Sequence, residues 1–109
     1  MGFHKGLFVI QNNPQCTSQL AHVVSGWIDE ENQYGFHKRY NKWVATDLVS
    51  GLLVTSQLTR KACVEWIESN ADRIAAEKET QSYKLKVESF RDALIHELKK
   101  IEIQNRMII

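Results

Sequence analysis

The chain has 109 residues, of which 43% are hydrophobic and 25% are charged, as in an ordinary globular domain. Its formal net charge is +1, so no overall field attracts nucleic acid or membranes, and any charged binding surface must be local. Apolar runs such as Leu7–Ile10 are too short to span a bilayer or to form a signal sequence. We therefore expect one domain over residues 1–109, located in the cytoplasm and without a membrane segment.

The residues that carry most enzyme chemistry are too scattered to indicate an active site. Cys16 and Cys63 lie far apart in sequence, which favours free thiols over a metal site. The four histidines share no spacing typical of metal ligands and are His4, His22, His37 and His96. Cys63 lies on an apolar helical stripe, so we interpret it as a buried thiol and not as a nucleophile. We expect no catalytic residue, metal, cofactor or small-molecule substrate.

The first third of the chain contains two apolar segments. Leu7–Ile10 is short and apolar, which predicts a buried strand. The second segment has apolar residues at the spacing of one helical face, namely Leu20, Val23, Val24, Trp27 and Ile28. Gly26 costs a helix about 1 kcal/mol relative to alanine, and a strand over His22–Asp29 remains the alternative. We expect a helix in this segment.

The stretch from Lys42 to Ser69 predicts a strand, a turn, a second strand and a helix, in that order. β-Branched and aromatic residues dominate on both sides of the turn, where Gly51 can adopt a positive φ. Thr59 is a suitable helix cap, because its hydroxyl can accept a hydrogen bond from the first turn. The apolar stripe of this helix comprises Ala62, Cys63, Trp66 and Ile67. We expect it to pack on the hairpin, with Trp43 and Trp66 in the core.

Residues 42–67 also carry a recognisable order of motifs. A strand with Trp43 and a turn ending in Gly51 precede a second strand, which leads into Leu58-Thr59-Arg60-Lys61-Ala62 and then Trp66. This order resembles the amino-terminal arm-binding domain of phage-type tyrosine integrases. That family packs a three-stranded sheet on one helix and docks the sheet in a DNA groove. The resemblance covers about a quarter of the chain, and residues 43–55 carry fewer Arg and Lys than the family usually has.

The resemblance implies DNA binding without recombinase chemistry, because the chain has no recombinase catalytic domain. It also suggests an accessory or inhibitor protein of a phage or plasmid as a further functional option.

The segment from Tyr34 to Trp43 alternates aromatic and basic residues. A strand would place four of these residues on one face, namely Tyr34, Phe36, Lys38 and Tyr40. Nucleobases stack on aromatic rings and phosphates attract cations, so this composition suits nucleic-acid binding. The simpler interpretation, which we favour, makes the aromatic residues part of the core and the cations a solvated surface.

The charge distribution supports a local basic patch. Between Tyr34 and Lys61 five cations accompany a single carboxylate, Asp47, so this segment has a charge of +4 within a nearly neutral chain. A clustered patch matters more for phosphate contacts than the net charge. The candidate nucleic-acid-binding residues are therefore Tyr34, Phe36, Lys38, Arg39, Lys42, Arg60 and Lys61. We expect DNA or RNA as the leading partner, bound through a basic, aromatic face of the sheet.

The last part of the chain predicts a long amphipathic helix over about residues 82–106. Its apolar residues recur every three or four positions, at Tyr83, Val87, Phe90, Leu94, Leu98 and Ile101. Such a stripe can cover the chain's own sheet or pair with a second copy. The alternative function is therefore a protein–protein interaction or regulatory module, with a homodimer interface formed by Phe90, Leu94, Leu98 and Ile101.

The complete prediction is an α+β fold, in which a small antiparallel meander packs against helices. Its sheet–helix core spans about residues 34–69 and is followed by the long C-terminal helix.

Overall fold

The computed structural model describes residues 2–11 and 21–108, with side chains described as far as Glu97 and for Lys99. An antiparallel sheet precedes the helices, which confirms the expected α+β fold. The strands are β1 (Phe3–Gln11), β2 (Ala21–Asp29), β3 (Tyr34–Arg39), β4 (Lys42–Asp47) and β5 (Leu53–Gln57). The helices are α1 (Arg60–Ser69), α2 (Ala71–Lys78) and α3 (Gln81–Ile108). The strands lie in the sheet in sequence order, so each pairs with its neighbour in the chain.

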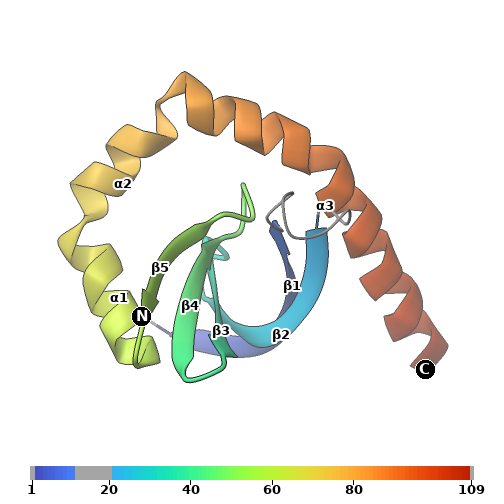
Figure 1. Ribbon diagram of the computed structural model, residues 1–109. Coiled ribbons are helices and arrows are strands. Elements are labelled where there is room, and N and C mark those ends of the chain that lie inside the picture. Colours follow the sequence, from blue (N-terminus) through green and yellow to red (C-terminus); the bar gives the residue numbers. More distant parts are fainter. Residues whose placement is uncertain (1, 12–20, 109) are drawn as a thin grey trace.

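The helices form an arc around the curled sheet (Figure 1). At one end of the arc α1 packs on β4 and β5, and at the other end α3 packs on β1 and β2. Between them α2 buries none of its residues. The arc therefore connects the two ends of the sheet through helices that are anchored mainly at α1 and α3.

Both anchors lie on the same face of the sheet, which we call the helix face. Strand register makes its central residues cross-strand neighbours, and these are Trp27, Phe36 and Ala45. Val9 and Ala21 share this face at its other end, where they are buried against Phe90 of α3. One face thus carries two apolar clusters, and each cluster is covered by its own helix.

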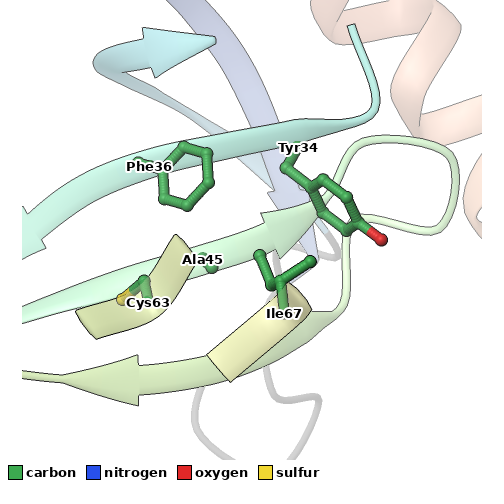
Figure 2. Packing of buried hydrophobic residues seen from close by; sticks show 5 residues of the cluster. All are labelled: Tyr34, Phe36, Ala45, Cys63 and Ile67. Atoms are coloured by element: carbon green, nitrogen blue, oxygen red, sulfur yellow. The ribbon is translucent and has the colours of Figure 1, made fainter. Parts of the chain in front are cut away.

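The larger cluster joins the helix face to α1 and is drawn in Figure 2, where the Phe36 ring lies above Ala45 and Cys63. Its buried residues are Tyr34, Phe36, Ala45, Cys63 and Ile67. Cys63 and Ile67 belong to the stripe predicted for this helix, so the predicted register is confirmed. The expectation that Trp43 and Trp66 lie in the core is met only in part, because both are half-buried and pack against the edge of the same cluster.

Both α1 and α3 begin close to where the sequence predicts. The Oγ1 atom of Thr59 accepts a hydrogen bond of 3.0 Å from the backbone N–H of Ala62. The long helix α3, predicted from about residue 82, begins at Gln81, and Oγ1 of Thr80 accepts a hydrogen bond of 3.2 Å from the backbone N–H of Tyr83.

The helix predicted from Leu20 to Ile28 is wrong, because Ala21–Asp29 forms β2. This strand pairs with β1 along its whole length, from Phe3 opposite Asp29 to Gln11 opposite Ala21. The valines and Trp27 suit a pleated strand as well as a helical stripe. Pairing with a nine-residue partner strand decides between the two, and a sequence pattern cannot show that partner.

The opposite side of the sheet, the second face, is buried by the curl of the sheet. Phe8 of β1 is 3% exposed, and its ring lies so close to Gly35 of β3 that an added Cβ would lie 2.6 Å from a ring atom. These residues are two strands apart, so the sheet must bend toward this face to bring them together. At the end of β1, the N–H of Gln11 donates a 2.8 Å hydrogen bond to Gly51 O in the β4–β5 turn.

His37 is the polar residue at the centre of the second face. It is 7% exposed, its ring meets Phe8 edge-on at 5.9 Å between centroids, and its Nδ1 has no hydrogen-bond partner among the described residues. Burial lowers the pKa of His37, and the charges of Arg39 and His22 lower it further. The folded state therefore favours the neutral imidazole.

We expect the free energy of unfolding to fall as the pH is lowered from about 7.5 to about 5. The unfolded chain takes up the His37 proton near pH 6.5, and the folded chain does so only at lower pH. The contribution of His37 to the free energy of unfolding is therefore complete above the pKa that it has in the unfolded chain. It is lost as the pH falls from there toward the lower pKa of the folded state. Urea unfolding at several pH values should show a weaker pH dependence for His37→Gln. The exposed-site control His96→Gln should keep the wild-type dependence, and equal curves for both variants would contradict the expectation.

Candidate binding site at the β3–β4 hairpin and the start of α1

Three aromatic rings from three strands surround the guanidinium group of Arg60. Its Cζ atom lies 4.6 Å from the ring centroid of Phe3, 5.1 Å from that of Trp27 and 6.0 Å from that of Trp43. All three distances are within reach of cation–π attraction. The group borders a surface cavity of about 560 Å³, which we call the aromatic cavity. Its lining residues are Phe3, Trp27, Trp43, Arg60, Lys61 and Val64.

The local structure explains how these residues come together. Trp27 and Trp43 lie on the helix face, and Phe3 extends this face at the start of β1, where its ring packs edge-on against Phe36 at 5.3 Å. Arg60 is the first residue of α1, a position where the helix dipole disfavours a cation. The three rings compensate by attracting the guanidinium. Lys5 adds a further cation, with Nζ 5.5 Å from the Trp27 ring centroid.

The β3–β4 hairpin places a second group of cations beside the aromatic cavity. Lys38 lies directly across from Trp43 on the helix face, and Arg39 lies across from Lys42 on the second face. All three cationic side chains are exposed. At the tip, Tyr40 is 89% exposed and has a φ of 56°. The tip thus presents a solvated aromatic ring between cations that point to both sides of the hairpin.

The structure does not bring the predicted nucleic-acid-binding residues onto one face of the sheet. Tyr34 and Phe36 are 6% and 0% exposed, so no base could stack on them without opening the core. The simpler interpretation of these two aromatic residues therefore holds. Strand alternation sends Lys38 to one face and Arg39 to the other, so the expectation of a single flat face is wrong. The cations instead surround the hairpin tip and the mouth of the aromatic cavity.

Sequence reasoning missed several residues of this site. Phe3, Lys5 and Trp27 lie far from the basic segment in sequence, and only the pairing of β1 with β2 brings them near Arg60. For Tyr40 a signal existed, because it follows the basic pair of a strand that has to reverse within a few residues. A residue at such a tip has no opposite strand to pack against.

The described residues offer no clear arrangement for metal binding or nucleophilic catalysis. Among them, no group of three or more His, Cys, Asp or Glu side chains could hold a metal ion. Cys63 is fully buried, burial raises the pKa of its thiol, and its Sγ donates to the Trp43 carbonyl oxygen at 3.5 Å. These properties agree with an inert core thiol. Cys16 lies outside the described residues.

The predicted dimer interface on α3 is partly used within the chain itself. Phe90 is 1% exposed and Leu94 is half-buried in the cluster with Val9 and Ala21, so neither presents a free apolar surface. The side chains of Leu98 and Ile101 lie outside the described part of the structure. Elsewhere on α3, Leu85 and Ile95 are exposed but ten residues apart, which separates them by about 80° around the helix axis. These two residues do not continue one stripe.

Two further findings bear on function. Within the described part of the chain, no helix combines the length and the apolar character needed to cross a membrane. Comparison of the chain with protein-family models, curated proteins and solved structures finds no match. The resemblance of residues 42–67 to integrase arm-binding domains therefore stays a prediction, and the functional argument depends on the chemistry of the site.

Proposed function

We propose that this protein is a non-enzymatic binder of single-stranded nucleic acid, which it holds at the hairpin tip and the aromatic cavity. The observation that most directly supports the proposal is that aromatic rings and cationic side chains lie close together around Trp43. The centroid of this ring lies 6.0 Å from the Cζ atom of Arg60, and Trp43 is the cross-strand neighbour of Lys38 on the same face. Single-strand binders combine a positive groove for the backbone with aromatic rings on which bases stack.

The distribution of charge around Trp43 supports a nucleic-acid backbone as the partner. The cations of the site come from both strands of the hairpin, from β1 and from the first turn of α1, and are Lys5, Lys38, Arg39, Lys42, Arg60 and Lys61. Cations on several sides of one projection suit a flexible strand that can wrap around it. A duplex would need them along one surface that fits a groove.

The conformation of Tyr40 also supports a binding role for the tip. A non-glycine residue at positive φ costs roughly 1–2 kcal/mol, and glycine would adopt the same turn without strain. The ring is too exposed to recover this cost by packing. Residues kept in such conformations often lie at functional sites, and an aromatic ring held away from the sheet is suited to stacking on a base.

Removal of two tip cations should weaken binding and reduce its dependence on salt. In fluorescence anisotropy with labelled oligo-dT and oligo-U, Arg39→Ala with Lys42→Ala should lower the slope of log K against log salt by about 0.7 for each lost phosphate contact. The matched control Lys84→Ala with Arg91→Ala removes the same charge from the exposed surface of α3 and should leave the slope unchanged. Absence of binding to single- or double-stranded DNA and RNA at low salt would refute the proposal. Tighter binding of duplexes than of single strands would mean that the protein docks in a groove of the duplex and does not hold a single strand around the hairpin.

The tyrosine at the tip provides an independent test in the same assay. Tyr40→Gly removes the ring and relieves the strain, so it should leave folding stability unchanged or improved while weakening binding by about 1–3 kcal/mol. Tyr40→Phe keeps a stacking ring and should bind like the wild type. Equal affinity of the glycine variant would exclude the tip from the binding surface.

A further inference from the structure

A second cavity lies between the β4–β5 turn and the helices, and its volume is about 570 Å³. None of its lining residues lines the aromatic cavity, so the two cavities are separate sites. A ligand in the second cavity would therefore contact none of the residues that line the aromatic cavity.

The second cavity is lined by a buried carboxylate, and one of its two oxygens has no hydrogen-bond donor among the described residues. Asp47 is 4% exposed, and its Oδ2 accepts hydrogen bonds from the Ser50 backbone N–H at 3.2 Å, the Ser50 hydroxyl at 2.6 Å and the Tyr83 hydroxyl at 2.6 Å. Burial and the bond to Asp47 raise the pKa of Tyr83, so its hydroxyl remains a donor. Asp47 Oδ1 has no hydrogen-bond partner among the described residues. A buried acceptor without a donor is costly, so this atom is suited to a donor from outside the chain.

Lys78 does not fill this role. Its Nζ lies 3.8 Å from Asp47 Oδ1, which is too far for a hydrogen bond, and lies 5.4 Å from the Tyr34 ring centroid. The ammonium group thus offsets the carboxylate charge without a hydrogen bond to Oδ1, which is itself buried from solvent.

The remaining lining of the cavity has an apolar part and a basic part. Leu53, which is 58% exposed, and the half-buried Trp66 and Ile74 contribute apolar surface. Arg73 and Lys86 contribute exposed cations in addition to Lys78, and Glu77 contributes one exposed carboxylate. With Asp47 included, the lining has three positive and two negative charges, and two of the positive groups but only one of the negative groups are exposed.

We propose that this second cavity binds a small amphipathic anion, with its apolar body against Trp66 and Ile74 and its acidic group at Arg73 and Lys86. A hydroxyl or amino group of the ligand donates to Asp47 Oδ1 once the neighbouring Lys78 side chain moves aside, because that oxygen is buried in the unliganded chain. The cavity is large enough for a ligand with one or two rings, and apolar walls with a few placed polar groups are typical of small-molecule sites. Charge complementarity favours a carboxylate, phosphate or sulfonate over a cationic ligand.

The probe for the test is 8-anilinonaphthalene-1-sulfonate, which combines aromatic rings, one N–H donor and one sulfonate. Titration of the folded protein should show saturable, single-site binding with increased probe fluorescence. Arg73→Ala with Lys86→Ala should weaken this binding about tenfold or more, because two charge-assisted contacts are removed. Lys84→Ala with Arg91→Ala is the control of equal charge on α3, outside the cavity lining, and should bind like the wild type.

Two further variants distinguish binding of the probe in this cavity from binding in the aromatic cavity and from nonspecific binding to the protein surface. Leu53→Trp adds bulk at the cavity wall and should block the probe, whereas Lys5→Ala with Lys61→Ala should have no effect. Thermal melts of each variant confirm that it is folded. Non-saturable binding, weakening by the Lys5 and Lys61 changes, or insensitivity to the Arg73 and Lys86 changes would each overturn the proposal.

Discussion

Gly26→Ala is expected to destabilise the protein by about 3 kcal/mol. An alanine Cβ at this position would collide with the backbone carbonyl oxygen of Phe36 on β3. A backbone atom cannot rotate away, so β2 and β3 would have to separate. Their ladder comprises two residue pairs, Trp27 with Phe36 and Ile28 with Gly35, and a separation at the neighbouring Gly26 would break the hydrogen bonds of both.

Gly6→Ala is the matched control, because Gly6 lies directly across from Gly26 in the β1–β2 pair. Its added Cβ would lie 2.9 Å from the Cδ1 atom of Ile28, the flexible end of a side chain. That atom can move by rotation, and alanine also restricts the unfolded chain, so a change within about 1 kcal/mol is expected. Urea unfolding of the two variants measures the difference. Similar losses in both would mean that the close approach of β2 to β3 is not what requires glycine.

Phe36→Ala is expected to cost about 3–5 kcal/mol, a large share of the 5–15 kcal/mol typical of a domain. Phe36 is fully buried between the helix face and α1, and its ring contacts the edge of Phe3, which forms a wall of the aromatic cavity. Loss of the ring should therefore leave a cavity in the larger core cluster and loosen that wall.

A comparison with Tyr40→Gly separates the structural residue from the binding residue. Phe36→Leu keeps apolar volume in the core, so its folded fraction should bind oligonucleotides with nearly wild-type affinity, although its unfolding midpoint falls. Tyr40→Gly should show the reverse, with intact stability and weaker binding. If Phe36→Leu instead lost affinity without losing stability, Phe36 would act in nucleic-acid binding, as the sequence-based assignment has it, and not mainly in stabilising the core.

The parts of the fold that the sequence predicts well are those specified by local patterns. The turn at Gly51, the strands on either side of it and the cap at Thr59 depend on neighbouring residues, and all three are found. The strand β2 is predicted wrongly as a helix, because the positions of its valines and Trp27 satisfy both periods. Only the partner strand β1 distinguishes the two, and its effect on β2 is not local.

The sites are harder to predict than the fold, because each gathers residues from distant parts of the chain. The aromatic cavity joins Phe3 to Arg60, which requires both the β1–β2 register and the packing of α1. In sequence, Asp47 is merely the single carboxylate of a basic segment. Its hydrogen bond from Tyr83 comes from a residue 36 positions later, which reaches Asp47 only because the helical arc returns to the sheet.

The order of elements along the chain also has a consequence for synthesis on the ribosome. All five strands are complete at Gln57, whereas every helix that covers the helix face comes after that residue. Val9 and Ala21, near the start of the chain, are buried against Phe90, so the second apolar cluster cannot close until α3 has emerged. The nascent meander therefore has an uncovered apolar face while the helices are being made, and this is the stage at which the chain most needs a chaperone or fast helix docking.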